Sequence, residues 1–114
     1  MNNSNTLIQI TKNGMGTGSE ELGLILISNY LKLSLAGDQL PKIITFYNAG
    51  VKLTCEGSPV LDSLKSIEKA GVKMIICKTC LNFFKLQDKL EVGIQGTMPD
   101  IMTLQSDADK VVNL

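Results

Sequence analysis

Three cysteines are the residues of this chain best suited to chemistry. Cys77 and Cys80 are three residues apart in the segment KMIICKTCLNFF (residues 73–84), and Cys55 lies in VKLTCEGSP (51–59). A CxxC pair can bind a metal, form a disulfide, carry sulfur as a persulfide or pack as small apolar side chains. The spacing alone does not choose among these four roles.

The composition narrows the chemistry open to these cysteines. The 114 residues suffice for one ordinary domain with one core, and 11 acidic residues balance 11 basic ones. No nucleic-acid or anionic-membrane surface is therefore expected. All the basic residues are Lys, and the chain has no His. The missing His removes the commonest general base and zinc ligand, and the missing Arg removes the bidentate grip on phosphate.

Three alternatives to sulfur chemistry stay open on these residues. A structural zinc ion wants four ligands, so three Cys without His would need a carboxylate such as Glu56, or a water, to complete the site. A thioredoxin-type reductase carries its CxxC after the first strand, often beside Trp, whereas this pair follows the third predicted strand and the chain has no Trp. Each cysteine, Cys55 above all, can also be a small packed residue.

The elements that must position the cysteines alternate between strand and helix. Apolar, β-branched runs predict strands at 7–11, 42–48 and 72–77, with short ones at 91–96 and 109–114. Helices are predicted from the N-cap Ser19 to about Ala36, over 58–71 with Ser58 as N-cap and Pro59 in the first turn, and from Thr97 to about Gln105. Residues 80–90 carry helical turns, and 49–57 are predicted as a loop. This order predicts an α/β fold with a parallel sheet and helices on both faces.

A parallel sheet gathers the chemistry at one edge. Every strand-to-helix loop lies at the carboxyl ends of the strands, and these loops are 12–19, 49–58, 77–80 and 96–98. All three cysteines therefore fall on that edge. A thiol there faces a helix N-terminus, which favours the thiolate, and Lys78 adds a positive charge.

Two other segments have both a functional and a structural reading. The glycine-rich stretch NGMGTG (13–18) is either a cradle of backbone N–H groups beside the cysteines or a flexible turn. The predicted first helix is apolar around most of its circumference, which suits burial in the core or contact with another subunit.

Residues 1–5 are expected to be disordered and 6–114 to form a single domain. No secretory signal and no apolar run of about 20 residues is visible, so the expected location is the cytoplasm.

Three stretches together resemble a known family. GVKLTCEGS (50–58), CKTCLNFFKLQDKLEVG (77–93) and TKNGMGTGSEELGLIL (11–26) resemble the DsrE/DsrF-like sulfur-transfer family. They are most similar to the DsrE-like domain of YedF-type, sulfurtransferase-like proteins of selenium metabolism. The resemblance covers the chain from about residue 6 and implies a three-layer α/β/α fold with a five-stranded parallel sheet.

The resemblance also implies a function. It implies a cysteine-persulfide relay or carrier of sulfurtransferase type, in which Cys77 accepts sulfur and Cys80 or Cys55 resolves or receives it. The implied partners are sulfur-donor and sulfur-acceptor proteins, such as a small carrier with a CPxP motif, together with further copies of the chain in a homo-oligomer. No cofactor, resident metal, nucleic acid or membrane is expected. The residues do not distinguish sulfur from selenium, and a non-catalytic oligomeric module with structural or zinc-binding cysteines, or a dithiol redox switch, is the alternative.

Overall fold

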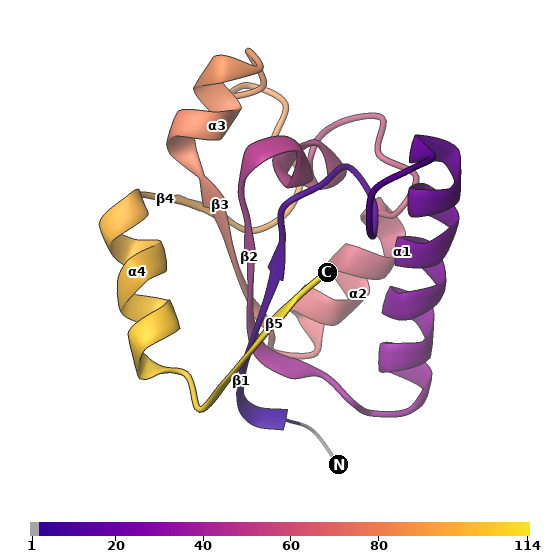
Figure 1. Ribbon diagram of the computed structural model, residues 1–114, viewed down its shortest axis with the longest axis vertical. Helices are drawn as coiled ribbons and strands as arrows, with labels where there is room; N and C mark the ends of the chain where they lie inside the picture. The colour runs from indigo at the N-terminus through magenta and orange to yellow at the C-terminus, as the bar shows by residue number, and fades with distance from the viewer. Residues whose placement is uncertain (1–2) are drawn as a thin grey trace.

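Five parallel strands form the sheet at the centre of the computed structural model, which describes residues 3–114 (Figure 1). Their order across the sheet is β4-β3-β2-β1-β5. The strands are β1 (Asn3–Ile10), β2 (Pro41–Phe46), β3 (Lys73–Cys77), β4 (Ile94–Gly96) and β5 (Lys110–Asn113). The helices are α1 (Glu20–Ala36), the 3-10 helix η1 (Asn48–Thr54), α2 (Leu61–Lys69), α3 (Lys78–Phe83) and α4 (Met98–Asp107).

The main core lies between the sheet and the helices α1 and α2, which stand together on one side (Figure 1). Side chains alternate across a strand, so every second residue of the central strands enters this core. These strand residues are Ile8, Ile10, Ile44, Phe46, Met74 and Ile76, and they are buried with Ile27, Leu31, Leu64 and Ile67 of the two helices. The burial of large aliphatic side chains here is the principal force that holds the sheet in place.

The opposite face of the sheet is covered by α4 and is more polar (Figure 1). Gln105 of α4 donates a hydrogen bond to Gln9 of β1, and Gln9 donates in turn to Asn113 of β5 at 2.6 Å. Thr45 is fully buried in β2, and its hydroxyl has no hydrogen-bond partner among the described residues. Within residues 3–114, no helix is long and apolar enough to cross a membrane.

The predicted α/β fold with a five-stranded parallel sheet is confirmed, and several element boundaries differ. Residues 48–54 form a 3-10 helix, although 48 was predicted as the end of a strand and 49–54 as part of a loop. Ser58 is not an N-cap: its hydroxyl accepts from the Val60 N–H in a preceding turn, and Val60 is the N-cap of α2. The prediction was wrong because a Ser-Pro pair also suits such a turn. Ser19 does cap its helix as predicted, since its hydroxyl accepts from the Leu22 N–H, and Thr97, predicted as the start of the last helix, is the N-cap that accepts from the Asp100 N–H.

The N-terminal strand is longer than the sequence pattern indicates. It begins at Asn3 and pairs with β2 on one side and with the edge strand β5 on the other. The expected disordered segment 1–5 therefore overlaps the strand, and its first two residues lie outside the described residues.

Candidate functional site

Cys77 and Cys80 are brought together by the junction of β3 and α3. Cys77 is the last residue of β3 and the N-cap of α3, so Cys80 is the third residue of that helix. An N-cap side chain and the third helical residue face each other at a helix start. The two thiols are accordingly neighbours, and burial and the proximity of Cys77 both raise the pKa of Cys80. Cys77 is 2% exposed, whereas Cys80 is half-buried and borders solvent.

The backbone of Asn48 holds the sulfur of Cys80. Its N–H donates to Cys80 Sγ at 3.0 Å, across the boundary between the adjacent strands β2 and β3. Asn48 has a positive φ of 52°, a conformation that Asn tolerates better than most residues, and its own Oδ1 accepts from the Ala49 N–H at 2.8 Å. This local turn aims the Asn48 N–H at the thiol. Sequence analysis missed Asn48, which it placed at the end of the predicted strand 42–48, although an Asn at the end of an apolar strand run is a signal for such a turn.

The Cys80 thiol has a higher pKa than an ordinary cysteine, so it keeps its proton to a higher pH. Burial raises the pKa of Cys80, the neighbouring Cys77 raises it further, and only the Asn48 N–H lowers it. The prediction that this edge of the sheet favours the thiolate is therefore not met at Cys80. The physical reason is that α3 has only six residues, so its dipole is small beside the cost of desolvation.

Cys55 takes part in a different set of contacts. It is 1% exposed, its thiol donates to the Val51 carbonyl at 3.3 Å, and its sulfur is 3.8 Å from the Thr54 hydroxyl. Burial raises the pKa of Cys55, and the carboxylate of Glu91 raises it further, against the Thr54 hydrogen bond. Its backbone pairs with Leu90. The contacts of Cys55 thus lie within η1 and the segment after α3, and none of them involves Cys77 or Cys80.

The surface beside Cys80 is aromatic and basic. Phe83, one helical turn along α3 from Cys80, is 79% exposed. Its ring packs edge-on against Phe84 at 5.2 Å between centroids, and the Lys52 ammonium lies 4.6 Å from the Phe84 ring centre. Phe83 thus presents an apolar ring to solvent on the same short helix as Cys80.

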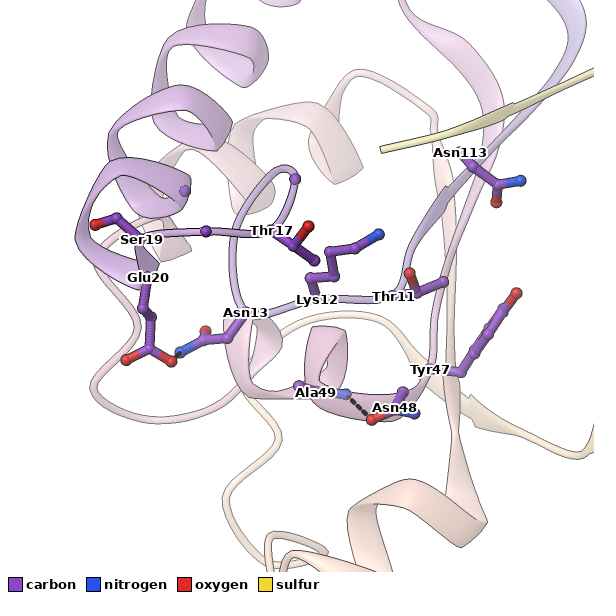
Figure 2. Close-up of a pocket in the computed structure, with 13 residues that line it drawn as sticks. Thr11, Lys12, Asn13, Thr17, Ser19, Glu20, Tyr47, Asn48, Ala49 and Asn113 are labelled. Atoms are coloured by element: carbon purple, nitrogen blue, oxygen red, sulfur yellow. Dashed lines mark hydrogen bonds between the residues drawn. The ribbon is translucent and has the colours of Figure 1, made fainter.

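An open cavity of about 820 Å³ lies at the edge of the sheet formed by the carboxyl ends of the strands (Figure 2). It lies over the ends of β1, β2 and β5, under the glycine-rich stretch, and is lined by Thr11, Lys12, Asn13, Gly16, Thr17, Gly18, Ser19, Glu20, Gly23, Tyr47, Asn48, Ala49 and Asn113. Asn48 belongs both to this wall and to the hydrogen bond that holds Cys80. The cavity and the thiols therefore share one residue.

Close glycine contacts fix the wall of this cavity. Gly14 has a φ of 144°, and a Cβ there would lie 2.6 Å from the carbonyl carbon of Gly23 in α1. The N–H of Met15 donates to the Gly23 carbonyl at 2.9 Å, which ties the loop to the helix. The start of the glycine-rich stretch is thus packed against α1, and Gly16 and Gly18 of the same stretch line the cavity.

The cysteines do not make a metal site with acidic neighbours. Among residues 3–114, no group of three or more His, Cys, Asp or Glu side chains is placed to hold a metal ion. Glu56, the ligand considered above, is exposed, and its backbone N–H donates to Lys89. The zinc-binding alternative therefore lacks a complete ligand set in the part of the chain that the structure describes.

Comparison with solved structures finds the same fold in three proteins. The protein of unknown function MTH1491 from Methanobacterium thermoautotrophicum superposes with a TM-score of 0.69 at 18% identity, over 98% of this chain and 99% of its own. The ychN protein from E. coli gives 0.63 at 24% identity, over 94% and 97%. The protein BT1422 from Bacteroides thetaiotaomicron, also of unknown function, gives 0.67 at 15% identity, over 96% and 95%. At these identities the likeness shows the fold alone.

Comparison of sequences gives one further finding. The profile described as the DsrE/DsrF-like family matches residues 6–114, which is nearly the whole chain. No curated protein sequence matches significantly.

Proposed function

The chain belongs to the DsrE/DsrF-like family, and on that premise we propose that it is a cysteine-persulfide relay protein that works through Cys77 and Cys80. The observation that carries the proposal is the hydrogen bond from the Asn48 N–H to Cys80 Sγ, at a helix start that places Cys77 beside Cys80 and at the sheet edge that holds an open cavity. A site that loads and then releases sulfur needs one thiol that a donor can reach and a polar group near that sulfur. A second thiol in contact with the first allows the persulfide to be resolved as a disulfide.

The exposures of the two thiols suggest their order of action. Cys80 borders solvent, whereas Cys77 is 2% exposed and lies behind it. We therefore assign the entry of sulfur to Cys80 and the second step to Cys77, the reverse of the order implied by the family resemblance. Cys55, which is buried among contacts of its own, is assigned a packing role.

Sulfur transfer through Cys80 and Cys77 requires no further catalytic residue of the chain, only a donor persulfide and an acceptor thiol. The Cys80 thiolate attacks the outer sulfur of a donor persulfide, so that a Cys80 Sγ–S bond forms, the donor S–S bond breaks, and the donor leaves as a thiolate. An acceptor thiolate then takes the same outer sulfur, and Cys80 returns to the thiol. Alternatively, Cys77 attacks Sγ of Cys80, which releases hydrosulfide and leaves a Cys77–Cys80 disulfide that a cellular dithiol must reduce.

Other parts of the surface suggest how protein partners bind. We propose that a sulfur carrier, such as one with a CPxP motif, docks on Phe83, because this exposed ring lies one turn from the entry thiol. The same chemistry transfers selenium from a selenopersulfide, which is what membership of the YedF-type subgroup would require. Intact mass spectrometry after treatment with a selenopersulfide donor tests whether the chain gains the mass of selenium.

A second copy of the chain is proposed to pack along α1. This helix exposes Leu22, Ile25, Leu26 and Leu33 at spacings that place them on one face. Glu21 and Lys32 flank that face about three turns apart, so in an antiparallel pair each Glu21 meets the Lys32 of the other copy. Light scattering should show an oligomer that Leu26→Glu dissociates. Lys32→Glu should weaken it, and Glu21→Lys in the same chain should restore it.

Intact mass spectrometry after treatment with inorganic polysulfide tests the relay. Wild type and Cys77→Ser should each gain the mass of one or more sulfur atoms, and Cys80→Ser should not. Loading of Cys80→Ser but not of Cys77→Ser would assign entry to Cys77 instead. Absence of any gain in all three would end the relay proposal, and a loss of two hydrogens without sulfur uptake would favour the dithiol redox switch.

A further inference from the structure

The cavity beside the thiol pair has a lining that selects for polar ligands. Its volume of about 820 Å³ falls in the range of about 300–1,000 Å³ that small-molecule sites occupy. Most such sites are lined by apolar side chains, but this one has amide groups from Asn13, Asn48 and Asn113 and hydroxyls from Thr11, Thr17 and Tyr47 (Figure 2). A ligand that fits here exchanges many hydrogen bonds with water for hydrogen bonds with the protein.

The charges of the cavity limit the ligand further. Lys12 supplies one ammonium, which is 3.4 Å from the Leu114 carbonyl oxygen. Glu20 supplies one carboxylate, which accepts from Asn13 Nδ2 at 3.3 Å. A polyphosphate would meet the Glu20 carboxylate with like charge and find only one cation. A ligand that carries both a carboxylate and an ammonium group has an opposite charge to offer to each residue.

The position of the cavity connects such a ligand to the sulfur chemistry. Asn48 lines the cavity and donates its N–H to Cys80 Sγ at 3.0 Å, so this one residue borders both the cavity and the thiol. A ligand seated under the glycine-rich stretch could extend a short thiol arm over Asn48 to Cys80. Amino-acid-derived thiols of low molecular mass, such as glutathione, combine this arm with both charges.

From these observations we propose that the cavity binds a zwitterionic low-molecular-mass thiol of the glutathione class and that its persulfide is a direct sulfur donor to Cys80. The inference rests on the proposed function and adds the class of small substrate. In the step, the Cys80 thiol first loses its proton to solvent, and its thiolate attacks the outer sulfur of glutathione persulfide. The Sγ–S bond forms, the donor S–S bond breaks, and glutathione leaves as a thiolate that takes up a proton. No external oxidant or reductant is consumed.

Binding is tested with S-methylglutathione, which cannot transfer sulfur, by titration calorimetry on the full chain. Wild type and Cys80→Ser should both bind it. Lys12→Gln and Glu20→Gln should each weaken binding about tenfold or more, the effect of losing one charged hydrogen bond. Two matched controls should bind like wild type: Asp62→Asn, which removes an exposed carboxylate in the first turn of α2, and Lys110→Gln on the edge strand. Neither control residue lines the cavity.

Sulfur transfer is tested with two donors. Glutathione persulfide is proposed to bind in the cavity before it loads Cys80, whereas inorganic polysulfide is expected to load Cys80 without binding there. Lys12→Gln and Glu20→Gln should lower kcat/KM for glutathione persulfide about tenfold or more and leave loading by inorganic polysulfide unchanged. If S-methylglutathione does not bind while polysulfide still loads Cys80, the small-thiol inference is overturned and the relay stands. If it binds but no donor loads either cysteine, the relay fails and the binding site stands. Equal competition by ATP would overturn the preference for a zwitterion.

Discussion

Replacing Gly50 by alanine should disturb the fold and the thiol site together. Gly50 is the third residue of η1, and its N–H donates to the Tyr47 carbonyl. A Cβ at this position would overlap the Ile10 carbonyl oxygen and lie 2.7 Å from the Ile10 carbonyl carbon. Carbon atoms in good contact are about 3.5–4.0 Å apart, so η1 would have to move away from β1 by about 1 Å.

The size of this movement sets the expected magnitudes. The Ile10 carbonyl also accepts from the Tyr47 N–H at 3.2 Å, so overpacking and a weakened backbone hydrogen bond add together. We expect the free energy of unfolding to fall by about 2–4 kcal/mol. A shift of about 1 Å at Asn48, which opens the same 3-10 helix, would also break its 3.0 Å hydrogen bond to Cys80 and raise the pKa of Cys80 further.

Two measurements check the Gly50→Ala prediction. Urea unfolding followed by circular dichroism gives the free energy of unfolding, and peptide mapping of iodoacetamide-treated protein gives the alkylation rate of Cys80 against pH. The matched control is Gly23→Ala, because a Cβ there meets its nearest atoms at 3.4 Å and the residue lies inside α1. It should be neutral or stabilising by up to about 1 kcal/mol. If Gly50→Ala matches wild type in both measurements, the argument from close packing is wrong.

Four further perturbations have definite expected outcomes. Cys55→Ala should destabilise by about 1–2 kcal/mol through lost packing while polysulfide loading of Cys80 continues; loss of loading would place Cys55 in the relay. Phe83→Ser should slow transfer to a protein acceptor and leave small-donor loading unchanged, and equal slowing of both would argue against a docking role. Because burial raises the pKa of Cys55 and Cys80, the folded state binds these protons more tightly than the unfolded state. The contribution of these two thiols to the free energy of unfolding should therefore be constant up to about pH 8.5, the ordinary thiol pKa, and decrease at higher pH. An increase in the free energy of unfolding above about pH 8.5 would contradict the burial of the two thiols. Thr45→Val should stabilise by about 1–2 kcal/mol in urea unfolding, since it removes a buried hydroxyl without a partner among the described residues, whereas a loss would mean that the hydroxyl is satisfied.

The sheet was predictable because its signals are local and repeated. Runs such as KIITF and KMIIC are short and rich in β-branched residues, which favours buried strands over helices, and alternation with helices then predicts parallel pairing and the shared edge. Boundaries were harder where two local structures suit the same residues. Asn48–Thr54 lacks a helical stripe, so nothing in its pattern separates a 3-10 helix from a loop.

The site was predictable in part, for a related reason. The junction of a strand and a helix places Cys77 and Cys80 three residues apart at a helix start, so sequence spacing is enough to bring them together. Cys55 shares their edge of the sheet, but a position on an edge does not decide which way a side chain points. The cavity draws Lys12, Tyr47 and Asn113 from three strand ends, and such a meeting depends on tertiary packing that no short motif records.

The Asn48 amide is also a spectroscopic reporter supplied by the chain itself. Its proton points at Cys80 Sγ, and the strength of a hydrogen bond to sulfur changes with the charge that the sulfur carries. In a nitrogen-15-labelled sample, this one resonance should move when the thiol becomes a thiolate and again when it becomes a persulfide. Residence of sulfur on the protein can then be followed in solution over time, without a dye or a substitution at either cysteine.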